Sequence, residues 1–208
     1  MLRLPDVEEL VNNGGEPPPE GQINENDISG EGWSLLTFDE LGTQNPTYTR
    51  DNPLVGLTHV TTHACFEGQS VIHLPSGAYS LSGSVPTVGQ ALVFDLTSGF
   101  YTQIKDDGAN PNTPVLAGSV GYDSPISVLF DVDVHAIALT GGFFNQVGST
   151  YIEAYDRLGH VLGSAVNTQE GIETFGFSVG SQAKIAGFSF YVNNTESLGF
   201  AIDNLRFK

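Results

Sequence analysis

The sequence is poor in the residues that support redox chemistry and nucleic-acid binding. Among 208 residues there are one Cys, one Met and one Trp, and Lys plus Arg number only 7. The single cysteine, Cys65, cannot form an intramolecular disulfide, and we interpret it as a small buried apolar residue. With 24 Asp and Glu residues the net charge is -17, which repels phosphate backbones and anionic lipids. We therefore expect no binding to nucleic acid or membrane.

Long apolar runs are also missing. No segment approaches the length of a transmembrane helix, and residues 1–10 lack the apolar core and small-residue cleavage site of a signal peptide. The chain as given is therefore expected to be soluble and not exported by the common route, unless a leader was removed.

What the chain has in abundance is glycine and aromatic residues. It contains 25 Gly, 13 Phe and 7 Tyr, a composition typical of many short strands joined by glycine-rich turns. Alternating apolar and polar residues predict strands in the first half at Trp33–Phe38, Val55–Phe66, Ser70–Leu74, Ala78–Ser82, Ala91–Leu96 and Tyr101–Ile104.

The second half has the clearer pattern, because Gly-, Asn- and Asp-rich turns separate its strands. The predicted strands are Val115–Val120, Ile126–Val132, Ala136–Thr140, Thr150–Tyr155, Val161–Val166, Thr174–Val179, Ile185–Val192 and Phe200–Phe207. No helix separates them that could build a parallel sheet. We expect an all-β fold, a two-sheet antiparallel β-sandwich of the jelly-roll type spanning residues 33–208.

Residues 1–32 differ from the rest in being acidic and rich in Pro and Gly. They include the run Glu16–Glu20, with three consecutive prolines, so an extended arm is expected. A polar arm of this kind becomes ordered when it lies on another surface. We predict a docking peptide for a protein partner, or alternatively an arm folded on its own domain. The apolar residues that would dock are Leu2, Leu4, Val7, Leu10 and Val11.

The carboxyl-terminal half resembles the β-sandwich ectodomains of bacterial exoproteins that bear a PEP-CTERM sorting tail, which are similar to jelly-roll carbohydrate-binding modules. The residues that carry the resemblance are Ala138–Phe144, Thr150–Asp156 with Gly159 and Leu162–Gly163, Phe175–Phe177, Ile185–Phe190 and Gly199–Phe207. In that family a strand ending in Asp-Asn, an apolar residue, a variable residue and Phe closes the sandwich. The sequence as given shows no Pro-Glu-Pro tail after Phe207, so we do not expect the export and sorting system of that family.

The resemblance implies a structural calcium ion where the first and last strands lie side by side. The matching positions are Asp39 or Glu40, after the strand that begins at Trp33, and Asp203 on the last strand. At period two Asp203 shares a face with Leu205 and Phe207, where a carboxylate needs a cation or N–H donors. The alternative is that Asp203 accepts backbone hydrogen bonds and Asp39 opens a turn.

Other metal sites are less well supported. Asp131 and Asp133 share a strand face, but no EF-hand loop surrounds them and a solvated edge explains them better. His59 and His63 are separated by a strand span of about 13 Å, which is too long for one zinc ion.

Catalytic motifs are missing as well, because the chain has no nucleophile elbow, zinc-protease motif or phosphate-cradling loop. Glu153 and Glu173 are the best pair for glycoside cleavage, but Glu153 lies in a strand with the pattern of a half-exposed sheet. We expect no enzyme activity. Tyrosine rings on such a sheet can instead stack on sugar rings, and Tyr151, Glu153 and Tyr155 form the predicted glycan platform.

Two functional hypotheses follow. In the first, the protein is a non-catalytic decoration or accessory subunit of a larger assembly such as a phage virion, docked by residues 1–32 and able to adhere to glycans. In the second, it is a calcium-stabilised carbohydrate-binding module of an extracellular or cell-surface protein. We expect a homo-oligomer in either setting.

Overall fold

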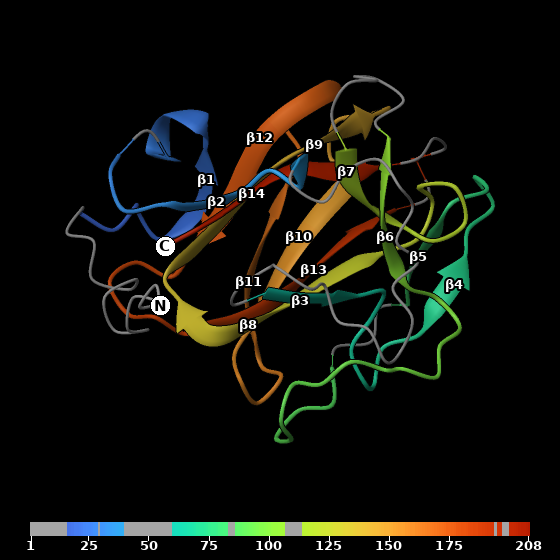
Figure 1. The fold of residues 1–208 in the computed structure, drawn as a ribbon, viewed down its shortest axis with the longest axis horizontal. Helices are drawn as coiled ribbons and strands as arrows, with labels where there is room; N and C mark the ends of the chain where they lie inside the picture. Colours follow the sequence, from blue (N-terminus) through green and yellow to red (C-terminus); the bar gives the residue numbers. More distant parts are fainter. Residues whose placement is uncertain are drawn as a thin grey trace, which may run out of the picture.

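The computed structural model describes residues 16–28, 30–39, 60–82, 86–106, 114–193, 195–196 and 200–208. Within these ranges the chain forms two antiparallel β-sheets and a separate hairpin (Figure 1). The predicted all-β, two-sheet antiparallel sandwich is therefore confirmed. The one helical segment in the described residues is the short 3-10 helix η1 (Glu25–Ile28).

The seven-stranded sheet has the spatial order β1-β12-β9-β14-β7-β6, and β2 pairs with β14 beside that path. Its strands are β1 (Gly21–Asn24), β2 (Ser34–Leu36), β6 (Thr102–Asp106), β7 (Pro114–Gly118), β9 (Ala136–Phe144), β12 (Gly171–Ser178) and β14 (Ala201–Phe207). Strand β14 is central, because it pairs with β9 along one edge and with β7 and β2 in turn along the other.

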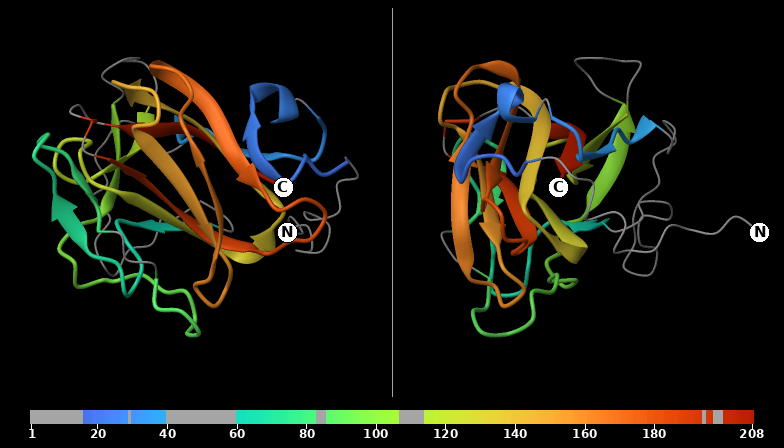
Figure 2. Two further views of the ribbon diagram at one scale, coloured as in Figure 1. Left: turned by 180° about the vertical axis from the view of Figure 1, so that it is seen from behind. Right: turned by 90° about the vertical axis from the view of Figure 1, so that its left-hand side faces the viewer.

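The five-stranded sheet has the order β11-β10-β13-β8-β3. Its strands are β3 (Val60–His63), β8 (Ile126–Val134), β10 (Thr150–Tyr155), β11 (Val161–Val166) and β13 (Ile185–Val192). The bounds predicted for β10, β11 and β13 agree with those observed. The hairpin of β4 (Val71–His73) and β5 (Tyr79–Leu81) lies on the opposite side of the molecule from β1 in both Figure 1 and Figure 2.

The core lies between the two sheets and is rich in phenylalanine. Phe144 of the seven-stranded sheet contacts Phe190 of the five-stranded sheet with ring centroids 6.3 Å apart. Phe130 and Phe207 meet across the sheets in the same way, at 5.2 Å. Large rings therefore interlock between the two sheets. Side chains on the other face of each sheet point away from this core and can make other contacts.

Part of the predicted arm belongs to the sandwich. Strand β1 pairs with β12, and its Ile23 is only 1% exposed. Lys208 donates hydrogen bonds from Nζ to the carbonyl oxygens of Glu16 and Glu31, which holds the C-terminus beside this segment (Figure 1). Residues 21–24 therefore pair with a strand of the sandwich, which agrees with the alternative of an arm folded on its own domain, and the domain boundary after residue 32 stays a prediction.

Strand β14 contains a β-bulge at Asp203. Its register with β9 shifts between Ile202 and Asn204, so Ile202 and Leu205 both enter the core although their spacing is odd. Simple alternation had placed them on opposite faces. Asp203 lies at the shift, is half-buried, and accepts a hydrogen bond from the Asn204 side chain at 2.8 Å. Leu205 and Phe207, which were predicted to share the face of Asp203, both contact the core, and the role of the Asp203 carboxylate stays a prediction.

Candidate functional site

The outward face of the five-stranded sheet carries an open group of polar and aromatic side chains. In β10, Ile152 and Ala154 are buried in the core, so alternation directs Tyr151 and Glu153 to the outside. Both side chains are half-buried, as is Tyr191 on the neighbouring strand β13. We call Tyr151, Glu153 and Tyr191 the open tyrosine face.

Tyr151 and Tyr191 are direct register partners across β10 and β13. Their rings lie 5.6 Å apart between centroids with an interplanar angle of 19°, so they form a nearly parallel pair. The amide of Asn193 donates to the Tyr151 hydroxyl at 3.4 Å and to the carbonyl oxygen of Gly148 at 2.8 Å. These contacts hold the Tyr151 ring in place at the end of the sheet.

The phenol of Tyr191 stays protonated over a wide pH range. Burial, followed by the negative charge of Glu153 and then the neighbouring Tyr151, raises the pKa of Tyr191 to about 12. Each cause disfavours the anionic phenolate. At neutral pH the Tyr191 hydroxyl is therefore available both as a hydrogen-bond donor and as an acceptor.

Tyr155 lies on the same face of β10 but has no exposed ring. It donates a hydrogen bond to Oε2 of Glu153 at 2.7 Å and accepts one from Nε2 of Gln69 at 3.0 Å. Its relative exposure is 0%, and burial is the main cause of a raised pKa, so it too stays a neutral phenol. Tyr155 therefore positions Glu153 and cannot stack on a ligand, which corrects the predicted Tyr151–Tyr155 platform.

The segments that bury Tyr155 come from residues 64–70 and 86–98, which we call the covering loops. Phe66 packs edge-on against the Tyr155 ring, with centroids 5.8 Å apart, and Leu92 joins the same cluster. Phe94 stacks on Phe66 at 5.0 Å. The stretch Ala91–Leu96 was predicted to be a strand, but it forms a loop with a single bridge between Phe94 and Phe66. Leu92 belongs to the cluster around Tyr155 and Phe94 packs against it, whereas Val93 and Leu96 are exposed.

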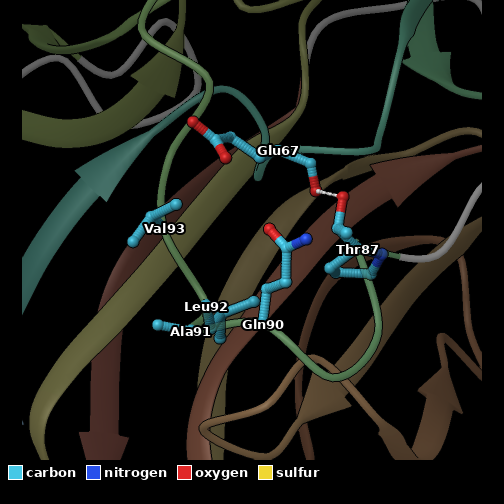
Figure 3. A pocket seen from close by; sticks show the side chains of 7 residues that line it. Glu67, Thr87, Gln90, Ala91, Leu92 and Val93 are labelled. Atoms are coloured by element: carbon cyan, nitrogen blue, oxygen red, sulfur yellow. Dashed lines mark hydrogen bonds between the residues drawn. The ribbon is translucent and has the colours of Figure 1, made fainter.

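A small pocket lies on the covering loops (Figure 3). The hydroxyl of Thr87 donates to the backbone oxygen of Glu67 at 3.4 Å across it. Glu67 is the one titratable side chain among its described lining residues, which are Glu67, Pro86, Thr87, Gln90, Ala91, Leu92 and Val93. This pocket therefore lacks the acid–base pair that a catalytic site needs.

Comparison with solved structures finds four matching chains, of which two are described here. A family 29 carbohydrate-binding module from Piromyces equi matches with a TM-score of 0.34 and 10% identity, covering 71% of this chain and 89% of that module. A family 11 carbohydrate-binding module from Clostridium thermocellum, in complex with a β-1,3-1,4-mixed-linked tetrasaccharide, matches with a TM-score of 0.27 and 11% identity, covering 91% and 96%. These values are too low to indicate a function.

Sequence comparisons add no relative. No protein-family model matches the chain, and no curated protein matches it. The case for a function therefore depends on the geometry of the residues themselves.

The residues predicted to hold calcium are only partly described. Strands β2 and β14 pair, as the resemblance implied for the first and last strands of the sandwich domain. Asp39 is exposed just after β2, whereas Glu40 lies outside the described residues. The described ranges contain no group of three or more His, Cys, Asp or Glu side chains suited to a metal. Calcium binding stays a prediction, which thermal unfolding with added Ca²⁺ and with a chelator would test.

The remaining candidates for chemistry are separated or occupied. Glu173 lies on β12 of the seven-stranded sheet, away from Glu153 on the other sheet, and its two oxygens accept hydrogen bonds from Thr168 and Gln169. Asp133 pairs with Arg157, whose Nε donates to it at 3.0 Å. Neither acid is placed to act with Glu153 on one ligand.

The predicted docking residues Leu2, Leu4, Val7, Leu10 and Val11 lie outside the described residues. Docking to a protein partner and homo-oligomer formation therefore stay predictions. No helix in the described ranges combines the length and the apolar character needed to cross a membrane.

Two residues of the site were not predicted as part of it. Alternation along Ile185–Val192 places Tyr191 on the outward face of the sheet. It does not show that Tyr151 on strand β10 is its partner. Gln69 lies in a loop 86 positions before Tyr155 in the sequence, and no local pattern links them.

Proposed function

We propose that this protein is a non-catalytic carbohydrate-binding module that holds its ligand on the open tyrosine face. The observation that supports this most directly is the nearly parallel Tyr151–Tyr191 pair beside Glu153. A tyrosine ring offers an apolar surface with a polar tip, which suits the alternating C–H and O–H groups of a sugar. Hydrogen bonds from Asn193 and Tyr155 orient two members of the face before any ligand arrives.

Pre-orientation matters because a ligand that meets ordered side chains loses less of its binding energy to ordering them. Tyr151 is held by its ring partner and by Asn193, and Glu153 is held by Tyr155. Tyr155 is in turn held by Gln69, which also donates to the hydroxyl of Ser189 at 3.3 Å. The polar contacts therefore continue from the open face into the buried region beneath the covering loops.

The arrangement favours binding over hydrolysis. Cleavage of a glycosidic bond normally requires two carboxyl groups at a defined separation. The open tyrosine face contains Glu153 alone, and the other candidate, Glu173, is on the opposite sheet with its oxygens engaged. A second carboxylate partner for Glu153 is thus missing from the face.

A glycan array followed by isothermal titration calorimetry tests the proposal. For the best glycan, Tyr151→Ala and Tyr191→Ala should each weaken binding by about tenfold, since each removes one ring contact. Tyr101→Ala is the matched control, because Tyr101 is a half-buried tyrosine next to β6 of the other sheet. No glycan-dependent signal above background, or an equal loss in all three variants, would contradict the proposal.

The decoration-subunit hypothesis depends on residues 1–15, which lie outside the described residues. It stays a prediction that identification of copurifying proteins would test, and it is compatible with glycan adhesion through the open tyrosine face. The location of the protein, on a virion, at a cell surface or outside the cell, also stays a prediction.

A further inference from the structure

Glu153 carries a negative charge on the open tyrosine face, and no ion pair within the described residues involves it. The hydrogen bond from Tyr155 reaches only Oε2 of the carboxylate. In the described part of the chain the ion pairs join Arg157 to Asp133 and His160 to Asp156, and neither involves Glu153. A half-buried carboxylate with a neutral phenol as its partner leaves a place for a positively charged group.

Three other described cationic side chains contact groups away from the open tyrosine face. Lys105 lies over the ring of Tyr122, 4.5 Å from its centroid. Lys208 donates to the carbonyl oxygens of Glu16 and Glu31, and Arg206 donates to the hydroxyl of Thr140. Lys184 directly precedes β13, whereas Glu153 pairs with Ser189 further along that strand. Within the described residues the charge on Glu153 is therefore available to a ligand.

Aromatic rings add to the attraction that this carboxylate has for a cation. The face of a tyrosine ring attracts an ammonium group within about 6 Å of its centroid. The parallel rings of Tyr151 and Tyr191 stand on adjacent strands, and Glu153 follows Tyr151 by two positions on the same face. One carboxylate beside two half-exposed rings is a combination that suits an ammonium ion, whereas a carboxylated or sulfated sugar would be repelled by it and by the net charge of -17.

Resting on the function proposed above, we infer that the open tyrosine face selects glycans with free, protonated amino groups over neutral glycans of the same length. The ammonium group pairs with Glu153, and the sugar ring that bears it contacts Tyr151 and Tyr191. Oligomers of glucosamine are the matching ligand class, because each residue carries one such group.

Calorimetry with a glucosamine hexamer and the N-acetylglucosamine hexamer tests the inference, since acetylation removes the charge from the same backbone. In a mildly acidic buffer the wild-type protein should bind the amino form about tenfold more tightly, as expected for an ion pair reinforced by cation–π contact. Glu153→Gln should remove this preference. Glu170→Gln is the matched control, because Glu170 is an exposed glutamate outside the face and its loss changes the net charge equally.

The control separates specific recognition from general attraction of a polycation to an acidic protein. If Glu153→Gln and Glu170→Gln reduce amino-glycan binding equally, or if both hexamers bind with equal affinity, the inference is overturned. Binding of neutral glycans that depends on Tyr151 and Tyr191 would then still support the proposed function. Absence of binding by any glycan, neutral or amino, would end both.

Discussion

The side-chain amide of Gln22 forms two hydrogen bonds with the backbone of Val166. Its Nε2 donates to the carbonyl oxygen at 2.9 Å, and its Oε1 accepts from the backbone N–H at 3.1 Å. Gln22 belongs to β1 of the seven-stranded sheet, whereas Val166 ends β11 at the edge of the five-stranded sheet. The Gln22 side chain therefore bonds the backbone N–H and C=O of the edge strand β11, as a neighbouring strand would. It joins the two sheets at this edge.

Replacing Gln22 with Ala should destabilise the fold by about 1 kcal/mol, because two hydrogen bonds at an exposed edge are exchanged for bonds to water. Urea unfolding followed by tryptophan fluorescence measures the change. Gln90→Ala is the control, since Gln90 is exposed on the covering loops and makes no side-chain hydrogen bond within the described residues. Equal midpoints for the two variants would mean that the Gln22 contacts contribute nothing.

Glu173→Gln should cost about 1–3 kcal/mol, because the carboxylate is 6% exposed and organises a turn with charge-assisted hydrogen bonds. It accepts from the backbone N–H and the hydroxyl of Thr168, both at 2.7 Å, and from the N–H of Gln169 at 3.1 Å. A glutamine can keep its oxygen toward the two N–H groups while its NH2 donates to the Thr168 hydroxyl, so the expected loss comes from removing the negative charge that strengthens these hydrogen bonds.

Thermal unfolding measures the effect, and Glu170→Gln on the same loop provides an exposed comparison. A melting temperature for Glu173→Gln that equals the one for Glu170→Gln would show that the buried carboxylate is dispensable. If Glu173→Gln instead kept its stability but lost glycan binding, the assignment of the ligand site to the other sheet would be wrong.

The strands that alternation predicted well are those whose ends are marked in the local sequence. Strands β10, β11 and β13 lie between turns rich in Gly, Asn or Asp, and each has one face in the core, so the residues themselves mark the ends. Strand β1 was missed because four residues provide little periodicity and its partner β12 is far along the chain. Pairing of such an edge strand depends on tertiary structure.

The candidate site was predicted from the sequence only where it depends on alternation within one strand. The shared face of Tyr151 and Glu153 follows from alternation in one strand. The burial of Tyr155 depends on Phe66 and Leu92 from the covering loops, and the pairing of Tyr151 with Tyr191 depends on the register of β13. Neither long-range relation leaves a signal in the local sequence. The bulge at Asp203 likewise interrupts a pattern that looked regular.

Gly163→Ala should destabilise the sandwich by about 1–3 kcal/mol through overpacking. The residue has a φ of 155° on β11, and a Cβ atom built there would lie 2.3 Å from Cζ of Phe177 on the facing sheet. The double variant Gly163→Ala/Phe177→Leu should cost less than the sum of the single changes, because the smaller side chain makes room for the methyl group.

Gly148→Ala distinguishes steric overlap from backbone strain, since Gly148 has a positive φ of 72° but no neighbour within 4 Å of a built Cβ. Its cost should be limited to the left-handed conformation, about 1–2 kcal/mol. Strict additivity in the Gly163 and Phe177 pair, measured by urea unfolding, would contradict close contact between them.

Acidification should weaken the fold in part through His63. Burial lowers the pKa of this imidazole, and the nearby negative charge of Asp95 offsets that effect only in part. The centroids of the His63 and Phe94 rings lie 5.7 Å apart. The Nδ1 atom of His63 is buried without a hydrogen-bond partner within the described residues. Below the ordinary histidine pKa of about 6.5, the unfolded chain therefore binds a proton that the folded protein does not.

His63→Phe keeps an aromatic ring but removes that proton site. Urea unfolding of both proteins should give a constant difference in stability above about pH 7.5, where histidine is neutral in either state. As the pH falls through about 6.5 and further, wild type should lose stability faster than the variant, because only wild type releases free energy by protonating the unfolded chain at this position. Parallel stability curves over that range would mean that His63 takes its proton equally well in the folded protein, and that burial beside Phe94 does not control its charge.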